Sequence, residues 1–225
     1  MTKTKSSFFL HKLKDFFSKT EICENIDTSY DGPFSEDEKI ALIEENFKNI
    51  FKILDLNLDD ESLNKSPFRI AKMYVRELFS GLNKENYPKI SLYNDFSSIE
   101  SKEVVYIKNI TVNSVCEHHF LPIVGKCHIA YIPNKKLIGL SKVNRIVNYY
   151  SKRPQLQEKL NAQIAKNLSF ILNTKNVAVF IEATHLCVTF RGVQDISSKT
   201  ASYNLLGKFK EDKNLRDEFF KNLSI

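Results

Sequence analysis

Helical and extended patterns alternate along this chain in blocks of unequal length, and this arrangement restricts its fold more than any other feature. Two stretches, 104–133 and 177–191, are rich in Val, Ile and Tyr, which is typical of strands. Between them, apolar residues recur at every fourth position, as in a helix that packs on a core: Leu156, Leu160, Ile164, Leu168 and Leu172. The blocks show neither βαβ regularity nor a Gly-rich phosphate loop. We therefore predict an α+β fold with an antiparallel sheet.

The first two helices are predicted from the signals at their ends. Ser35 and Glu38 have the spacing of a capping box, and apolar residues follow at three- and four-residue steps, which indicates an amphipathic helix. Ser66 and Pro67 are suited to the N-cap and first turn of a second helix, and Gly81 is suited to its end.

Three further helices are expected in the second half of the chain. Gly139 introduces one, Pro154 lies where the helix with the leucine repeat would take its first turn, and a C-terminal helix is predicted from its apolar spacing: Leu215, Phe219 and Leu223. The turn-forming residues before Ser35 mark a linker. We expect an N-terminal arm and linker at 1–34 and one folded domain at 35–225.

Charge and cysteine content narrow the classes of function. The formal charge of +6 favours an anionic partner, which could be nucleic acid, an acidic membrane or a phosphorylated small molecule. Four cysteines in 225 residues are too few for a disulfide scaffold, which favours a reducing compartment and a metal. No apolar stretch approaches the roughly 20 residues that span a bilayer. We expect a cytoplasmic protein without a membrane partner, although residues 1–18 leave an organelle transit peptide open.

Cysteine and histidine residues form a candidate metal site. Cys116 and His119 are three residues apart in a predicted loop, so a thiolate and an imidazole can meet at one ion. In a strand over 177–191, period-two geometry would place polar residues on one face: His185, Cys187, Thr189 and Arg191.

Cys116, His119 and Cys187 would make a Cys₂His set with a fourth position open for water, as in catalytic zinc sites. A closed structural zinc site remains the alternative, because Cys127 and His128 follow in the next strand. His118 could equally be an ordinary core histidine.

Five motifs occur in an order and at intervals that make the chain similar to GTP cyclohydrolase I: Cys116-Glu117-His118-His119-Phe120, Gly139-Leu140-Ser141-Lys142, Arg153-Pro154-Gln155-Leu156-Gln157-Glu158, His185-Leu186-Cys187 and Arg191-Gly192-Val193. Upstream, 69–75 and 79–82 extend the likeness, and the N-terminal arm lies outside it. The resemblance implies a tunnelling fold, in which small antiparallel sheets backed by helices join into a barrel. It also implies a homodecamer of stacked pentamers with active sites between subunits, and a catalytic domain at 35–225.

The resemblance further implies an activity. A zinc-activated water would attack C8 of GTP, open the imidazole ring, release formate and lead to 7,8-dihydroneopterin triphosphate, for folate or tetrahydrobiopterin synthesis. Cys116, His119 and Cys187 would hold Zn²⁺, and His118 and His185 would be the acid–base residues. Histidine suits this role because N7 must receive a proton near neutral pH as the ring opens.

Substrate contacts are implied in the same way. Glu158, assisted by Gln157, would accept the N1 and 2-amino hydrogens of guanine, although Glu158 could be only a first-turn carboxylate that stabilises its helix. Ser141 would act in catalysis and near the triphosphate. Cationic residues would bind the triphosphate, the last two of them from a neighbouring subunit: Lys142, Arg145, Arg191, Arg69 and Lys72.

One segment departs from the family pattern, and two other functions stay open. The chain has Ser198–Asn204 where family members carry a threonine-rich run, which weakens any role for those hydroxyls. A zinc-containing nucleic-acid-binding module is disfavoured because the 33 basic residues are dispersed among 27 acidic ones. A related tunnelling-fold enzyme that acts on another pterin or a deazaguanine would use a nucleophilic cysteine, and the Cys₂His set favours hydrolysis of GTP instead.

Overall fold

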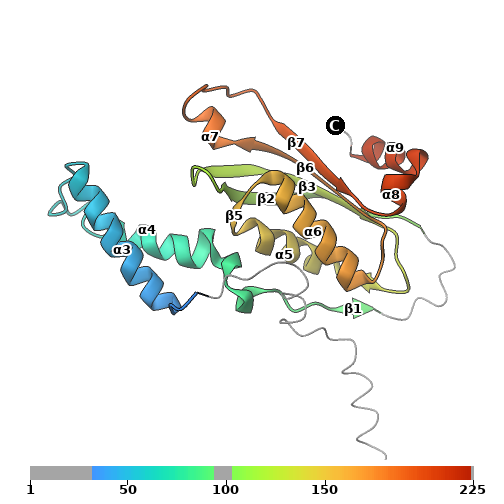
Figure 1. The fold of residues 1–225 in the computed structure, drawn as a ribbon, viewed down its shortest axis with the longest axis horizontal. Helices are drawn as coiled ribbons and strands as arrows, with labels where there is room; N and C mark the ends of the chain where they lie inside the picture. Colours follow the sequence, from blue (N-terminus) through green and yellow to red (C-terminus); the bar gives the residue numbers. More distant parts are fainter. Residues whose placement is uncertain (1–31, 94–102, 224–225) are drawn as a thin grey trace, which may run out of the picture.

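The computed structural model describes residues 32–93 and 103–223. Its main element is a five-stranded sheet with the strand order β5-β2-β3-β6-β7 (Figure 1). The strands are β5 (Pro154–Gln155), β2 (Val105–Cys116), β3 (Pro122–Tyr131), β6 (Val177–His185) and β7 (Thr200–Leu205). All neighbours are antiparallel except β2 and β5. A second, two-stranded sheet pairs β1 (Leu92–Tyr93) with β4 (Leu137–Ile138). The α+β class predicted from the sequence is confirmed.

The central hairpin of β2 and β3 is longer and less interrupted than its sequence suggests. Asn113, Ser114 and Gly125 interrupt the Val/Ile/Tyr-rich pattern of 104–133, but all three lie inside the strands. Gly125 is required there because a Cβ atom would come within 2.1 Å of the Glu182 carbonyl oxygen of β6. The irregularity falls instead between Ile107 and Ile110, where Asn109 has a φ of 60°.

Helix α3 (Glu36–Ile53) begins as predicted. Glu38 N–H donates to Ser35 Oγ at 3.3 Å, and Ser35 N–H donates to the Glu38 carboxylate at 2.7 Å. The next helix, α4 (Ser66–Met73), differs from the prediction, because Ser66 lies inside it and Lys65 is the N-cap. It continues as a π-helix over Tyr74–Leu78 and a 3₁₀ turn over Ser80–Leu82, so Gly81 lies within the 3₁₀ turn and does not end an α-helix directly.

Helices α5 (Leu140–Ser151) and α6 (Gln157–Leu172) cover one face of the main sheet (Figure 1). Their apolar residues meet the inward side chains of the strands in the larger core, which includes Ile146, Ile164, Leu168, Ile129 and Val179. The other face is covered near one end by α8 (Lys208–Glu211) and α9 (Lys213–Asn222). Phe209 and Phe219 of these helices share a smaller core with Ala130, Ala178 and Phe180. Alternation along β3 and β6 thus separates two cores.

Two predictions for the last 75 residues were wrong in detail. The strand that starts at Val177 ends at His185, and α7 (Leu186–Thr189) follows it, so period-two geometry does not extend to Arg191. Strand β7, which was not predicted from the sequence, follows at Thr200–Leu205. Pro154 belongs to β5 and precedes helix α6, whose N-cap is Leu156. The predicted terminal helix is confirmed as α9. Within the described residues, no helix combines the length and apolarity that crossing a bilayer requires.

Candidate metal centre and active site

The connection between β2 and β3, here called the ligand loop, consists of Cys116, Glu117, His118, His119, Phe120 and Leu121. Three backbone hydrogen bonds fix its shape. Cys116 N–H donates to Leu121 O at 2.9 Å, and Phe120 N–H donates to Cys116 O at 2.9 Å. Glu117 N–H donates to Gln155 O of β5 at 3.1 Å, which ties the loop to the neighbouring strand. The loop is therefore built by the sheet itself.

Cys187 reaches the ligand loop because of the strand register. His185, the last residue of β6, pairs with Ile123 near the start of β3, so β6 ends beside the loop. The chain then turns into α7, and Cys187 lies in its first turn. The ligand atoms of Cys116, His119 and Cys187 all lie within 4.8 Å of one another. A group able to hold a metal ion is thus assembled where two strands, β2 and β6, end at the same end of the sheet.

The donor set fits a zinc ion. Burial raises the pKa of the Cys187 thiol, and the neighbouring Cys116 raises it further. Two thiolates this close repel each other, and a divalent cation between them removes that penalty. Two sulfurs and one imidazole are ligands that zinc prefers. Neither Cys127 nor His128 belongs to this group, although both were considered as further ligands. Cys127 is fully buried in the core, and burial raises the pKa of its thiol strongly.

His185 lies two residues before Cys187, and its imidazole is held by a buried side chain. His185 Nε2 is 2.8 Å from Oε1 of Gln157, which is only 1% exposed. Burial lowers the pKa of His185, and the Glu158 carboxylate partly opposes that shift. Burial therefore favours the neutral imidazole over the imidazolium. The other candidate acid–base residue, His118, is exposed, with its ring centroid 6.2 Å from that of His119.

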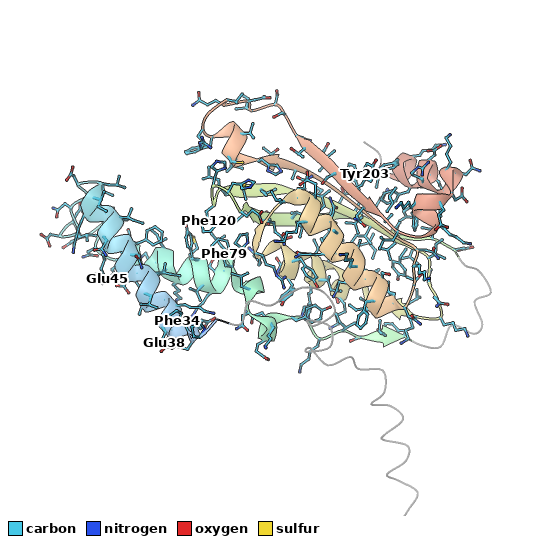
Figure 2. All side chains as sticks on the ribbon, in the orientation of Figure 1. Phe34, Glu38, Glu45, Phe79, Phe120 and Tyr203 are labelled. Carbon is cyan, nitrogen blue, oxygen red and sulfur yellow. The ribbon has the colours of Figure 1, made fainter. Side chains whose placement is uncertain are left out.

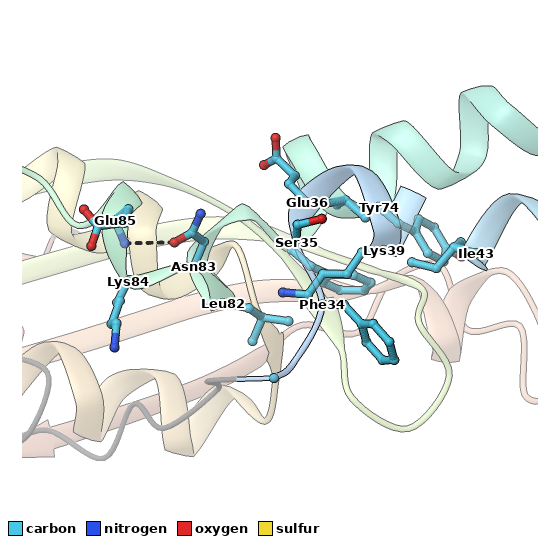
Figure 3. A pocket seen from close by; sticks show the side chains of 13 residues that line it. Phe34, Ser35, Glu36, Lys39, Ile43, Tyr74, Leu82, Asn83, Lys84 and Glu85 are labelled. Atoms are coloured by element: carbon cyan, nitrogen blue, oxygen red, sulfur yellow. Dashed lines mark hydrogen bonds between the residues drawn. The ribbon is translucent and has the colours of Figure 1, made fainter. Parts of the chain in front are cut away.

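Phe120 connects the ligand loop to the N-terminal helices. Its φ of 53° is unusual for a bulky residue. Its ring centroid is 5.2 Å from that of Phe79 and 6.4 Å from that of Tyr74, and Figure 2 shows Phe79 and Phe120 close together. Tyr74 and Phe79 also line a pocket of about 640 Å³ against the start of α3 (Figure 3). The metal ligands are not among the residues that line this pocket, so we place the chemistry at the ligand loop.

The other predicted site residues come from four elements. Ser141, Lys142 and Arg145 lie in the first turns of α5, and Glu158 lies in the first turn of α6. Arg191 follows α7 and is near enough to Cys187 to lower the pKa of its thiol. Arg69 and Lys72 are exposed on α4, which packs mainly against α3. The structure thus groups Arg191 and Glu158 with the ligand loop and His185, and places Arg69 and Lys72 on the N-terminal helices.

Sequence analysis missed three side chains around the site: Asn161, Ser202 and Phe120. Asn161 is completely buried one turn after Gln157, on the same face of α6. The i, i+4 spacing of Gln157 and Asn161 was a signal in the sequence that could have placed both amides on one helix face. Ser202 could be placed only once β7 was known.

Fold and site together define a class: an α+β protein with a three-residue metal-binding group at the end of its sheet and a second histidine beside it. The family model described as GTP cyclohydrolase I matches residues 43–224. GTP cyclohydrolase 1 of Wigglesworthia glossinidia brevipalpis is 50% identical over 183 residues, which cover 81% of this chain and 84% of that protein. GTP cyclohydrolase 1 of Erwinia tasmaniensis is 44% identical over 205 residues, covering 90% of this chain and 92% of that protein.

A solved structure titled as the archaeosine synthase QueF-Like in the apo form is a more distant match. It is 18% identical and covers 48% of this chain and 97% of its own, with a TM-score of 0.41. The family model and the relatives decide the assignment: the chain belongs to the GTP cyclohydrolase I family. The resemblance drawn from the motifs is confirmed.

Proposed function

We propose that this protein is a zinc-dependent GTP cyclohydrolase I, which hydrolyses the imidazole ring of GTP, releases formate and yields 7,8-dihydroneopterin triphosphate. The observation that carries the proposal is the convergence of Cys116, His119 and Cys187 within 4.8 Å, beside His185. The names of the relatives support the same activity.

The three ligand residues would hold Zn²⁺ through two thiolates and one imidazole. When bound there, Zn²⁺ would act as a Lewis acid and make water nucleophilic near neutral pH. His118, which is exposed between two ligand residues, would give a proton to N7 as the C8–N bond opens. His185, neutral because of its burial, is suited to accept a proton from the attacking water.

We assign substrate recognition to polar and charged residues outside the metal-binding group. Glu158 is exposed on the first turn of α6, where its carboxylate can accept two hydrogen bonds from the N1 and 2-amino groups of guanine. Arg191, Lys142 and Arg145 would bind the triphosphate, with Ser141 beside them. Arg69 and Lys72 would come from a neighbouring subunit, because they lie on the separate N-terminal helices.

A homodecamer of tunnelling-fold subunits fits the free edges of the sheet. β7 has no partner on its outer side among the described strands, and β5 covers only Val115 and Cys116 of β2. Such edges pair with other strands unless they are protected. We propose that neighbouring copies pair there, that residues 35–225 form the catalytic domain, and that the protein works in the cytoplasm, where thiols stay reduced. GTP is then the small-molecule partner, and neither nucleic acid nor membrane is one. The product would enter folate or tetrahydrobiopterin synthesis.

The decisive experiment is incubation of the zinc-loaded protein with GTP, with formate and the fluorescent oxidised pterin measured together. We expect both products in equal amounts from GTP and neither from ATP, which has no donor pair for Glu158. Glu158→Gln should weaken the use of GTP and retain zinc, because an amide offers one acceptor oxygen in place of two. Failure of the zinc-loaded protein to release formate from GTP would refute the proposed function.

A further inference from the structure

The side-chain amide of Gln157 is buried in the protein and has four hydrogen-bond partners, of which three acceptors share the two hydrogens of its NH₂ group. Its Nε2 lies 3.0 Å from Ile181 O in β6, 3.0 Å from Thr200 O in β7 and 2.9 Å from Ser202 Oγ. Its Oε1 lies 2.8 Å from His185 Nε2. Gln157 is only 1% exposed, so both ends of its amide are used within the subunit.

These contacts determine which way the amide points. Backbone carbonyl oxygens only accept hydrogen bonds, so the group that faces Ile181 O and Thr200 O must be the NH₂ group. The reversed amide would place its oxygen against two carbonyl oxygens in a buried site, which is strongly unfavourable. The amide oxygen therefore faces His185. An oxygen can only accept, so His185 Nε2 must carry the hydrogen.

We propose that Gln157 is a positioning residue that fixes His185 as the Nε2–H tautomer and leaves Nδ1 as the ring atom that exchanges protons with substrate or water. The role in catalysis rests on the proposed function, whereas the tautomer rests on the hydrogen bonds alone. Gln157 thus acts through His185, and Glu158, the next residue, faces the substrate. The sequence-based prediction that Gln157 assists guanine binding stays the alternative, and the kinetic test below distinguishes the two.

The surrounding network explains why the amide stays in place. Ser202 Oγ is also 2.6 Å from Asn161 Nδ2, so α6 and β7 meet in one partly buried polar cluster with β6. Rotating the Gln157 side chain away would leave two strand carbonyls without their side-chain donor. Ser202 belongs to the segment that departs from the family's threonine-rich pattern, and a serine hydroxyl still accepts from both amides.

The tautomer can be observed directly by neutron diffraction from crystals of the zinc-loaded, full-length wild-type protein exchanged into D₂O. We expect deuterium on His185 Nε2. A nuclear-density map in which Nε2 carries no deuterium overturns the proposal. The measurement needs no substrate, so an absence of activity towards GTP would refute the proposed function and leave the tautomer standing.

The catalytic consequence is tested with Gln157→Met, which keeps the size of the side chain and removes both polar ends. Loss of an orienting partner typically costs about 10- to 100-fold in activity. We expect kcat to fall by that factor with KM for GTP and zinc content unchanged. A rise in KM at constant kcat would make Gln157 a substrate-binding residue, and unchanged kcat and KM would also overturn the positioning role.

A matched control separates positioning from stability. Asn167 lies on the same helix, is completely buried and accepts a hydrogen bond from Tyr87 OH at 2.9 Å, but it is ten residues from Gln157, or about 15 Å along the helix. Asn167→Ala should lower Tm and leave kcat per folded subunit at the wild-type value. An equal fall in kcat for both variants at matched loss of Tm would contradict the proposal, because the effect of Gln157→Met would then be general destabilisation.

Discussion

The ligand loop and the segment 190–199, which follows α7, both border the metal centre but are built differently. The ligand loop is held by two internal backbone hydrogen bonds and a third to β5. In the segment 190–199, Phe190 N–H donates to Leu186 O of α7 at 2.9 Å, and Gln194 N–H donates to Arg191 O at the longer distance of 3.4 Å. Its apolar side chains face solvent: Phe190 is 75% exposed, Val193 83% and Ile196 85%.

This difference matches a division of the proposed chemistry: the loop would serve metal binding and proton transfer, and the segment would serve triphosphate binding. In the proposed function, the loop would supply Cys116, His119 and His118 from one hairpin, so the reacting centre would be assembled within a single subunit. The segment carries Arg191 and exposed apolar residues, which suit contact with another copy of the chain. We therefore expect changes in the loop to act on metal binding and kcat, and changes in the segment to act on KM.

The largest effect is expected for Cys187→Ser, because Cys187 joins the two regions. A serine hydroxyl is a poor zinc ligand, and the two protein ligands that remain would not be enough to hold the ion. Zinc content by elemental analysis and formate release should both fall below detection while the circular dichroism spectrum is retained. Cys127→Ala is the matched control: this thiol is buried in the core away from the ligands, so zinc should stay bound while Tm falls. Full zinc occupancy in Cys187→Ser would remove Cys187 from the metal site.

His118→Ala tests the loop without touching a metal ligand. Loss of one general acid–base group should lower kcat about 10²- to 10⁴-fold with zinc content and Tm unchanged. His128→Ala is the control, because His128 is buried within β3 outside the metal-binding group. It should lower Tm and leave turnover per folded subunit intact. If His118→Ala instead melts early and turns over GTP normally, His118 is a packing residue.

Arg191→Ala tests the segment in the same way. Removal of a charge-assisted hydrogen bond to phosphate costs about 1.5–3 kcal/mol, so KM for GTP should rise roughly 10- to 100-fold with kcat little changed. Lys199→Ala removes the same charge nearby, but Lys199 pairs with Glu182 at 3.2 Å, so KM should stay near the wild-type value. An equal rise in KM for both variants would mean that the segment contributes only general positive charge.

Local signals in the sequence were sufficient for much of the fold. The Ser35–Glu38 capping box and the terminal apolar spacing identified α3 and α9, because caps and periodicity act within a few residues. Cys116 and His119 were grouped correctly for the same reason. Cys187 was grouped with them because a strand was predicted over 177–191. That strand prediction is wrong at Cys187, because the chain turns into α7 at Leu186.

Features that depend on distant partners could not be derived in this way. β7 exists because it pairs with β6 from Ala178 to Ala183, and its polar sequence alone resembles a loop. The burial of Gln157 likewise results from the meeting of α6, β6 and β7. Chain-local patterns carry no register between strands, so these placements required the three-dimensional structure.

The smallest effect is expected for Asp195→Asn, which weakens the best-ordered turn of the segment 190–199. Asp195 Oδ1 accepts hydrogen bonds from Ser197 N–H at 2.8 Å, Ser197 Oγ–H at 2.7 Å and Ser198 N–H at 3.3 Å.

These bonds lower the pKa of Asp195 from 3.8 to about 2. A carboxyl group with a lowered pKa stabilises the turn only when ionised, so its contribution is complete above pH 3.8 and is lost as the pH falls through about 2. In hydrogen exchange, the amides of Ser197 and Ser198 should exchange faster in the variant, with Tm unchanged because the turn lies at the surface outside both cores. The difference between wild type and variant should shrink as the pH falls from about 5 to about 3. A difference that is constant over this range would show that the carboxylate charge does not order the turn, and the segment would then differ from the ligand loop even more than the structure indicates.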